Sequence, residues 1–538
     1  MGVRFFLLTL IFAVLFGLLG FKLYNLQILQ SGYYFNKVQA RTEASAQLQM
    51  RRGQIFFTDK YGNDITVAQN KDYPVIYAVP KEISDPEKTA EDLAPALNMA
   101  VGDISKDISD PQSLFHMISE KVGQDQLDAV QNLNLSGVYE DTKQYRFYPY
   151  ENIGAQTLGF VGLNKDTSQP KGLYGVEKYY DDALADGHDI NLTIDRVLQT
   201  QAEQMISKLV TDHKASGGNI IIEEPQTGKI LAMANYPDFD LNNYQNYPVE
   251  DFINSATQLV YEPGSVFKPI TMAAGIDTST FTPQTTYTDY GHVTINGKTI
   301  TNWDHSTHGP GTTMTNVIEY SINTGAVWAQ QQIGRPTFYK YLKLFGLETP
   351  TGIDLPDEVS GSLRNLERKN AQDIDYATAA YGQGTSVTPI QMINAFSVFA
   401  NGGLLMRPYI NANSQPYVVR RVISQDTAQK VVGMMLSAVN KAGVATVPQF
   451  KIAGKTGTAF IPDFVHGGYL PDDYIHTFIG MAPASNPKFV IMIKLDKPED
   501  ANKELAALTV VPAFQQLATF TLNYLNIPPD NPTTPSAK

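Results

Sequence analysis

The feature that most constrains this chain is a strongly apolar run near its N-terminus. The run Phe5 to Phe21 contains no charged residue and lies between Arg4 and Lys22. A membrane-spanning helix needs about 17–25 such residues, which this run reaches if the helix continues past Lys22. A cleaved signal peptide is the alternative, but no pair of small residues suitable for cleavage follows the run. We therefore predict one uncleaved anchor over residues 1–30, with the N-terminus inside the cell and the rest outside.

The composition of the chain indicates a globular protein and excludes several classes of function. The 538 residues are 43% hydrophobic and 18% charged, and they leave room for about three domains. The net charge of -13 argues against binding to nucleic acid, which needs a concentrated basic face. The chain has no cysteine, which excludes disulfides, thiolate zinc sites and cysteine nucleophiles.

The segment before residue 193 is expected to form a mixed domain over residues 31–192. Arg51 to Ala68 is typical of two strands joined by a turn. Residues 80–135 carry alanine, leucine and charge at helical spacing, whereas 146–180 are rich in Gly, Tyr and Phe. The second of these stretches indicates loops and short strands.

A second domain is predicted over residues 193–527. Apolar residues at three- and four-residue steps predict a helix over 198–209, with Thr193 or Asp195 as its cap. The glycine turn at 225–228 predicts a hairpin. The strands are expected at 219–224, 229–235, 452–458, 474–481 and 488–495. This pattern favours an α+β fold, an antiparallel sheet flanked by helices. The proline-rich residues 528–538 are expected to be a disordered tail.

The second domain contains a candidate nucleophile in a Ser-x-x-Lys motif. A serine hydroxyl needs a nearby base, and a lysine one helical turn away can supply it. The motif occurs three times, beginning at Ser168, Ser265 and Ser485. The first and last contain a proline between serine and lysine, which opposes a shared helical turn. Ser265 and Lys268 instead follow Pro263-Gly264 and begin a buried-helix sequence, so we take Ser265 as the candidate.

Two further polar motifs follow Ser265 in order. Ser321-Ile322-Asn323 begins 56 residues after Ser265, and Lys455-Thr456-Gly457 begins 134 residues after Ser321. Each tripeptide alone is weak evidence, since a helix connection or a strand end can have the same residues. The ordered trio indicates a catalytic constellation.

The trio resembles the three motifs of the penicillin-binding protein and serine β-lactamase superfamily. Other segments are similar to its class B high-molecular-weight branch, the monofunctional transpeptidases of division and elongation. These segments are Arg52-Gly53-Gln54-Ile55, Asp59-Lys60-Tyr61-Gly62, Gly159-Phe160-Val161-Gly162, Gly175-Val176-Glu177, Leu192-Thr193-Ile194-Asp195, Tyr381-Gly382-Gln383-Gly384 and Asn401-Gly402-Gly403. The resemblance implies an extended pedestal over 31–192 and a β-lactamase-like transpeptidase domain over 193–527.

The resemblance also implies a role for each motif residue. Ser265 would attack a terminal D-Ala-D-Ala of a peptidoglycan stem peptide, and β-lactams would acylate the same oxygen. Lys268 would be the base, Ser321 would relay the proton to the leaving amine, and Asn323 would hold the substrate amide. The substrate carboxylate would meet Lys455, Thr456 and Thr458, in the strand that also holds Gly457. The backbone N–H groups of Ser265 and Thr458 would form the oxyanion hole.

The resemblance implies no cofactor, and it leaves other functions to weigh. One alternative is a D,D-carboxypeptidase or β-lactamase, although Ile322 stands where class A β-lactamases have Asp. Another is a silent scaffold or penicillin sensor, although no motif residue is lost. A zinc site at His305 and His308 lacks an obvious third ligand. No Glu-Asp-x-x-Phe motif marks a glycosyltransferase domain, so a separate membrane glycosyltransferase of the FtsW/RodA type is the expected partner.

Overall fold

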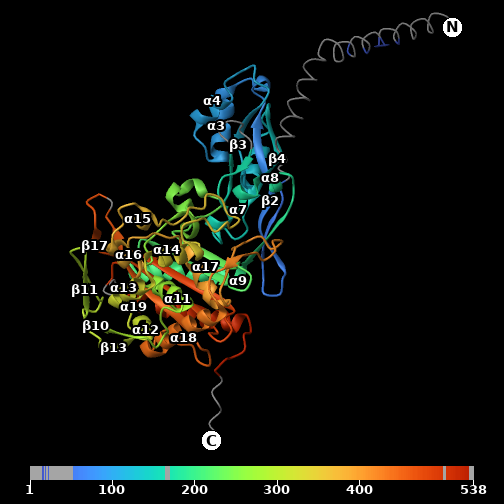
Figure 1. The fold of residues 1–538 in the computed structure, drawn as a ribbon. Helices are drawn as coiled ribbons and strands as arrows, with labels where there is room; N and C mark the ends of the chain where they lie inside the picture. The colour runs from blue at the N-terminus through green and yellow to red at the C-terminus, as the bar shows by residue number, and fades with distance from the viewer. Residues whose placement is uncertain are drawn as a thin grey trace, which may run out of the picture. The chain divides into compact units, whose positions relative to one another are not determined.

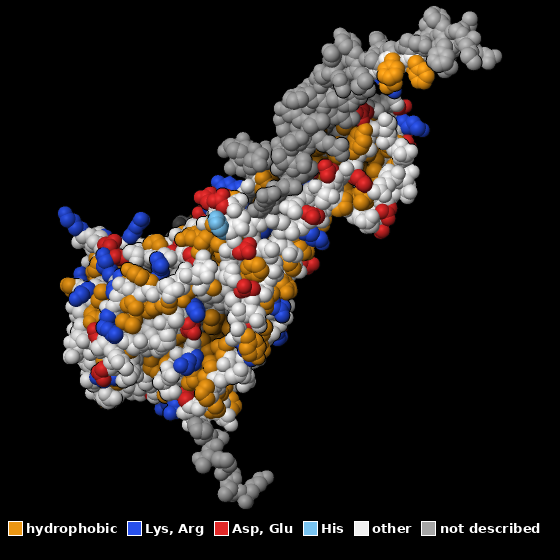
Figure 2. Space-filling view, turned by 90° about the vertical axis from the view of Figure 1, so that its right-hand side faces the viewer, with side chains coloured by type: hydrophobic (Ala, Val, Ile, Leu, Met, Phe, Trp, Pro, Cys, Tyr) orange, Lys and Arg blue, Asp and Glu red, His pale blue; other side chains and the backbone are white. Residues whose placement is uncertain are grey.

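A computed structural model describes residues 12, 15, 16, 19, 22, 52–163, 170–463, 465–500 and 505–531. The described residues form two compact units (Figure 1). One unit contains Gln69–Phe147, and the other contains Gly53–Ala68 and the chain from Tyr148 onward. On the face drawn in Figure 2, acidic and basic side chains are interspersed.

The unit around residues 69–147 is a small sheet packed against helices. The C-terminal part of β2 pairs with β4 and with the short strand β3, all antiparallel. Alternate residues of β2, Ile76 and Ala78, join the helices in a buried core. The elements are β2 (Asp64–Ala78), η2 (Pro80–Glu82), α3 (Pro86–Leu97), α4 (Val101–Asp107), β3 (His116–Ser119), α5 (Gln124–Leu133) and β4 (Val138–Phe147). The helical prediction for 80–135 is confirmed for three helices but misses β3, which forms through pairing with the distant β2.

The larger unit begins with strands that lead into the second predicted domain. The strand β1 pairs antiparallel with the start of β2 and parallel with β7. Short helices and strands precede β7 in the sequence. The strand–turn–strand prediction for 51–68 is confirmed. The elements are β1 (Ile55–Thr58), α6 (Ala155–Leu158), β5 (Val161–Leu163), β6 (Pro170–Gly172), α7 (Gly175–Tyr179), α8 (Asp181–Ala185) and β7 (Ile190–Asp195).

A five-stranded antiparallel sheet in the order β16-β17-β18-β8-β9 forms the centre of this unit. The isoleucines of β8 explain how it is layered, because successive side chains of a strand point to opposite faces. Ile220 and Ile222 pack with helices α9 and α19, whereas Ile221 packs in the larger core with α11, α17 and α18. Both faces are therefore covered by helices (Figure 1). The predicted α+β architecture is confirmed.

The remaining elements follow in chain order. They are α9 (Arg196–His213), β8 (Gly217–Glu224), β9 (Lys229–Tyr236), η3 (Tyr244–Asn246), η4 (Val249–Phe252), α10 (Ser255–Gln258), η5 (Gly264–Phe267), α11 (Lys268–Asp277), β10 (Thr286–Asp289), β11 (His292–Ile295), β12 (Lys298–Thr301), β13 (Gly309–Thr313), α12 (Met314–Glu319), α13 (Asn323–Ile333), α14 (Arg335–Leu344), α15 (Arg364–Glu367), α16 (Asp373–Ala379), α17 (Pro389–Ala400), β14 (Leu404–Met406), β15 (Val418–Arg421), α18 (Gln425–Ala442), β16 (Ala453–Pro462), β17 (Tyr469–Ala482), β18 (Phe489–Asp496) and α19 (Ala506–Tyr524).

Local signals explain where α9 and the first hairpin begin and end. Asp195 caps α9, since its carboxylate accepts hydrogen bonds from the N–H groups of Val197 (2.8 Å) and Leu198 (3.0 Å). The turn between β8 and β9 contains Gly228 at φ +85°. The predicted helix, hairpin and three later strands are all confirmed in type and place.

The two ends of the chain are described only in part. Most of the predicted anchor lies outside the described residues, and no helix of the part that is described is long and apolar enough to cross a membrane. Of the predicted tail, 528–531 are described. Asp530 accepts hydrogen bonds from the N–H of Lys451 (2.8 Å) and the hydroxyl of Ser485 (2.6 Å).

Candidate active site

Ser265 lies on a tight turn that leads directly into a buried helix. The turn η5 is a 3₁₀ turn over Gly264–Phe267, and α11 continues from it with Pro269 in its first turn. Gly264 has φ +60°, and a Cβ there would lie 2.9 Å from the Thr458 carbonyl oxygen. A side chain at this position is therefore excluded twice, by backbone conformation and by the approach of β16. This approach places Ser265 beside the third motif.

Lys268 gathers the first two motifs around its amine. Its side chain is fully buried, and Nζ lies 3.0 Å from Ser265 Oγ. The same nitrogen donates to the Ser321 carbonyl (2.5 Å), and it lies 3.1 Å from Ser321 Oγ and 2.9 Å from Asn323 Oδ1. A neutral amine has two N–H donors and one lone pair, so it could donate to two of these oxygens and accept from the Ser265 hydroxyl.

Lys455 lies on the other side of Ser321. Its side chain is only 4% exposed, and Nζ is 3.1 Å from Ser321 Oγ. It also contacts the carbonyl (3.1 Å) and the hydroxyl (3.3 Å) of Thr456. The hydroxyl of Ser321 thus connects the two lysines and can pass a proton between them.

Burial and charge shift the pKa of both lysines downward. Burial lowers the pKa of Lys268 well below its usual value, and the charge of Lys455 lowers it further. The negative charge of Asp304 acts in the opposite direction on Lys268. Burial also lowers the pKa of Lys455 to about 7. A buried amine beside Ser265 whose pKa is lowered in this way is suited to be a general base.

The second motif is held in an unusual backbone conformation. Ser321 has φ +57°, in the left-handed region that non-glycine residues rarely adopt. This turn directs both its carbonyl and its hydroxyl to Lys268. Asn323 begins α13, and its Nδ2 donates to the Thr301 carbonyl (3.0 Å). Strained residues of this kind occur mainly where surrounding contacts and function require them.

The third motif lies on β16, the edge strand of the central sheet. Lys455, Thr456, Gly457 and Thr458 follow one another along β16, whose one hydrogen-bonded neighbour in the sheet is β17. A Cβ on Gly457 would lie 3.0 Å from the Pro263 carbonyl, so glycine allows β16 and η5 to approach. The structure therefore brings Ser265, Lys268, Ser321, Asn323 and Lys455 together, with Thr456, Gly457 and Thr458 alongside.

The loop before β13 adds two residues that sequence reasoning missed. Trp303 donates from Nε1 to the Tyr320 carbonyl (3.0 Å), next to Ser321, and the residue is 57% exposed. Asp304 is close enough to Lys268 to affect its pKa. The sequence marked this loop only through His305 and His308. The described residues contain no group of three His, Cys, Asp or Glu side chains placed to hold a metal ion.

Two glutamates lie near the motifs, and each has a structural partner. Glu319 Oε2 accepts from Asn316 Nδ2 (2.8 Å), and Oε1 accepts from the Ser437 hydroxyl (2.5 Å) of α18. Glu262 accepts from the Tyr469 hydroxyl (3.0 Å), and burial raises the pKa of Glu262 to about 7. Glu319 thus fastens the Ser321 turn to α18 and has neither oxygen unoccupied.

Comparison with known proteins agrees with this geometry. The family described as "Penicillin binding protein transpeptidase domain" matches residues 218–515, and "Penicillin-binding Protein dimerisation domain" matches 47–222. The chain is 32% identical to stage V sporulation protein D of Bacillus subtilis over 483 residues, which cover 81% of this chain and 73% of the relative. It is 28% identical to the peptidoglycan D,D-transpeptidase FtsI of Escherichia coli, covering 95% and 90% of the two chains.

A solved structure gives the same result. The apo-form of penicillin-binding protein 3 from Mycobacterium tuberculosis superposes with a TM-score of 0.66 at 28% identity, covering 73% of this chain and 94% of that one. The matched families together account for most of the chain, and the three motifs converge within the transpeptidase match. This chain therefore belongs to the penicillin-binding proteins, in the class B branch that joins a dimerisation domain to a transpeptidase domain.

Proposed function

We propose that Ser265 is the acylated nucleophile of this peptidoglycan D,D-transpeptidase. The observation that supports this most directly is the position of Lys268 Nζ, 3.0 Å from Ser265 Oγ and fully buried. Neutral Lys268 takes the hydroxyl proton as Ser265 Oγ bonds to the carbonyl carbon of the penultimate D-alanine. The resulting oxyanion is stabilised by the backbone N–H groups of Ser265 and Thr458.

Collapse of this intermediate expels the terminal D-alanine. The C–N bond breaks, and the amine leaves with a proton delivered through Ser321 Oγ, which lies 3.1 Å from both Lys268 Nζ and Lys455 Nζ. The substrate carboxylate is held by Lys455 with Thr456 and Thr458, and Asn323 orients the substrate amide. A second stem peptide then supplies an amine that attacks the acyl-enzyme and releases Ser265. The product is a cross-link between two stem peptides.

Transfer rather than hydrolysis is favoured because both glutamates that flank the motifs are held by structural partners. Rapid hydrolysis requires a positioned carboxylate to activate water. Glu319 already accepts two hydrogen bonds, and Glu262 is hydrogen-bonded to Tyr469. Substituting Glu319→Gln should leave the lifetime of the penicilloyl adduct unchanged. A markedly longer lifetime in this variant would identify Glu319 as a hydrolytic base and move the enzyme toward the hydrolases.

We extend the proposal to the organisation and setting of the chain. Residues 1–30 are a membrane anchor, 31–192 a pedestal, 193–527 the transpeptidase domain and 528–538 a tail. The catalytic domain lies outside the cell membrane, where stem peptides and β-lactams reach it. Glycan polymerisation is supplied by a separate membrane glycosyltransferase of the FtsW/RodA type.

Mass spectrometry of the penicillin-treated protein tests the proposed nucleophile. We expect a single penicilloyl adduct on Ser265 and none in the Ser265→Ala variant. Ser485→Ala is the matched control, because Ser485 also has a lysine three residues later but donates its hydroxyl to Asp530. An adduct on Ser485, or undiminished labelling of Ser265→Ala, would contradict the assignment.

A further inference from the structure

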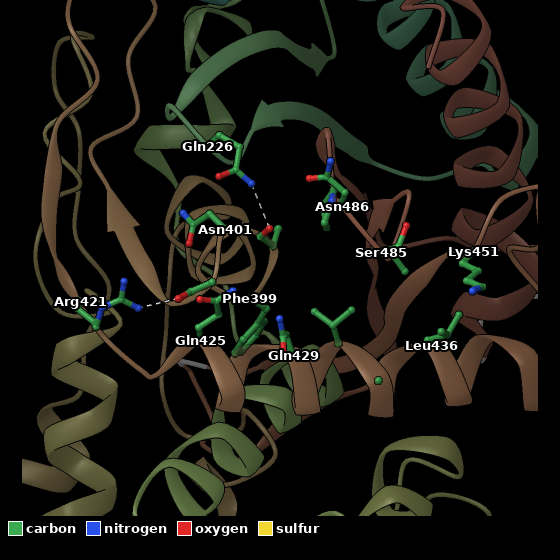
Figure 3. Close-up of a pocket in the computed structure, with 16 residues that line it drawn as sticks. Gln226, Phe399, Asn401, Arg421, Gln425, Gln429, Leu436, Lys451, Ser485 and Asn486 are labelled. Carbon is green, nitrogen blue, oxygen red and sulfur yellow. Dashed lines mark hydrogen bonds between the residues drawn. The ribbon is translucent and has the colours of Figure 1, made fainter. Parts of the chain in front are cut away.

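A groove on the side of α18 away from α11 and α12 contains none of the catalytic residues. Its volume is about 570 Å³. One wall is a face of α18 that carries Gln425, Gln429, Gly433 and Leu436. Figure 3 shows Gln226 and Asn486 on the opposite side of the groove, from the β8–β9 turn and from the loop before β18.

The polar side chains in this groove have unused hydrogen-bonding capacity. Among the described residues, no hydrogen-bond partner is found for the side-chain amides of Gln425, Gln429 or Asn486. Each amide offers two N–H donors and one acceptor oxygen. Gln226, in contrast, already donates to the Ala400 carbonyl (3.3 Å). Three unpaired amides on facing walls are suited to pair with the backbone of a peptide.

The charge of the groove is opposite to that of the whole chain. The chain has a net charge of -13, but none of the described residues that line the groove is Asp or Glu. Arg421 and Lys451 lie toward its two ends (Figure 3). Arg421 Nη1 donates to the Gly402 carbonyl (2.7 Å), and no partner among the described residues contacts Lys451 Nζ. One acidic side chain lies beside the Lys451 end of the groove: Asp530, which accepts hydrogen bonds from the Lys451 N–H and the Ser485 hydroxyl.

The length of the groove wall sets the length of its ligand. Gln425 and Leu436 are eleven positions apart on α18, which corresponds to about 16 Å along a helix. An extended chain of about five residues covers the same distance. In an extended all-L peptide, side chains four positions apart point to the same face. Carboxylates at the first and fifth positions, about 13 Å apart, would therefore both point toward the groove.

We propose that this groove binds an extended, acidic segment of a partner protein, about five residues long. Its carboxylates pair with Arg421 and Lys451, and its backbone hydrogen-bonds to the amides of Gln425, Gln429 and Asn486. A stem peptide fits less well, because its mixed L and D centres do not place side chains on one face at regular steps. Gly433 leaves the middle of the groove open, since a Cβ built there meets nothing within 4 Å.

Fluorescence anisotropy with the full-length, penicilloylated chain tests this proposal, since the adduct blocks the catalytic cleft. The probe is a labelled all-L pentapeptide with aspartate at both ends, compared with an analogue that has asparagine there. We expect the acidic probe to bind about tenfold more tightly or better, because hydrogen bonds to charged groups are the stronger ones. Equal binding of the two probes would overturn the proposal.

Two variants test the location of the binding site. Gly433→Tyr fills the groove and should abolish binding, whereas Gly433→Ala should retain it. Gln429→Glu changes an exposed position, adds a negative charge and should weaken binding by about tenfold. Unchanged binding in both Gly433→Tyr and Gln429→Glu would overturn the proposal. So would a soluble stem pentapeptide that binds the groove more tightly than the acidic probe.

Discussion

The cleft proposed around Ser265 and the α18 groove place lysine in opposite environments. In the cleft, Lys268 and Lys455 are buried, and oxygens surround both amines at hydrogen-bond distance. In the groove, Lys451 lies only four residues before Lys455 but is exposed, and its amine has no partner in the part of the chain that is described. Burial lowers the pKa of a lysine, so a buried lysine can act as a base. An exposed lysine instead serves as a positive charge.

The glycines of the two regions differ in how closely other atoms surround them. Gly264 is in the left-handed region, with the Thr458 carbonyl in the space that a side chain would need. Gly433 lies within a regular helix and has open space where a side chain would be. The cleft therefore leaves little freedom for substitution, whereas the groove remains open to a ligand.

Loss of a buried lysine should have the largest effect. Lys268→Met should slow acylation by penicillin by about 10²–10⁴-fold, the range expected when a general base is removed. Lys451→Met should leave the rate unchanged, because Lys451 lies outside the cleft. Stopped-flow labelling with a fluorescent penicillin measures both rates, and thermal unfolding checks that each variant is folded. A similar loss in both variants would break the contrast between the two lysines.

Gly264→Ala should lower the free energy of unfolding by about 1–3 kcal/mol, since a non-glycine residue is strained at φ +60°. The variant should also acylate slowly, because relief of the clash moves η5 away from β16. Urea unfolding and the labelling rate measure the two effects. A stable, fully active Gly264→Ala variant would mean that η5 and β16 need not approach so closely.

The pH dependence of stability should distinguish the cleft lysines from other groups. Burial holds the pKa of Lys455 at about 7, whereas in the unfolded chain it is near 10.5. The unfolded state thus binds more protons between these values, so stability rises with pH, by at most about 1.4 kcal/mol per unit for each such group.

Buried carboxyls have the opposite sign, since burial raises the pKa of Glu223 to about 8 and that of Glu203 to about 7. Glu223 still titrates around pH 8, so Lys455 is isolated by comparing the parent chain with the Lys455→Met variant over pH 8 to 10, where the buried carboxyls and tyrosines are common to both. Urea unfolding over this window should give a smaller slope for Lys455→Met than for the parent chain. An identical slope would show that Lys455 is not desolvated in the folded protein.

The smallest effect is expected at Gly433. Gly433→Ala should raise the free energy of unfolding by about 0.5–1 kcal/mol, because alanine is the better residue in a helix interior. The acylation rate should not change. Urea unfolding measures this gain. A loss of stability would show that a methyl group at position 433 collides with neighbouring atoms.

Sequence patterns predicted the elements whose signals are local. The cap of α9, predicted as Thr193 or Asp195 and found at Asp195, and the glycine turn at 228 lie within short stretches of sequence. The spacing of Ser265 and Lys268 on one turn is also a local signal, whereas the approach of Ser321, Asn323 and Lys455 was expected only from the resemblance. The strand β3 escaped prediction, since only its pairing with β2 makes it a strand.

Features formed by distant segments could not be predicted in this way. Asp304 affects Lys268 through space, and nothing in its own sequence neighbourhood marks it. The link from Glu319 to Ser437 joins residues 118 positions apart. The α18 groove combines the β8–β9 turn, α18 and the loop before β18. Such contacts depend on the packing of whole elements, which the spacing of residues in one segment does not report.

The left-handed backbone of Ser321 has a consequence for the evolution of stability and activity. A non-glycine residue in this conformation lowers the stability of the folded protein by about 1–2 kcal/mol. The same conformation directs the Ser321 side chain toward Lys268 and Lys455. Glycine at this position would relieve the strain but remove the hydroxyl. Selection for a more robust fold and selection for turnover therefore act in opposite directions at this one residue.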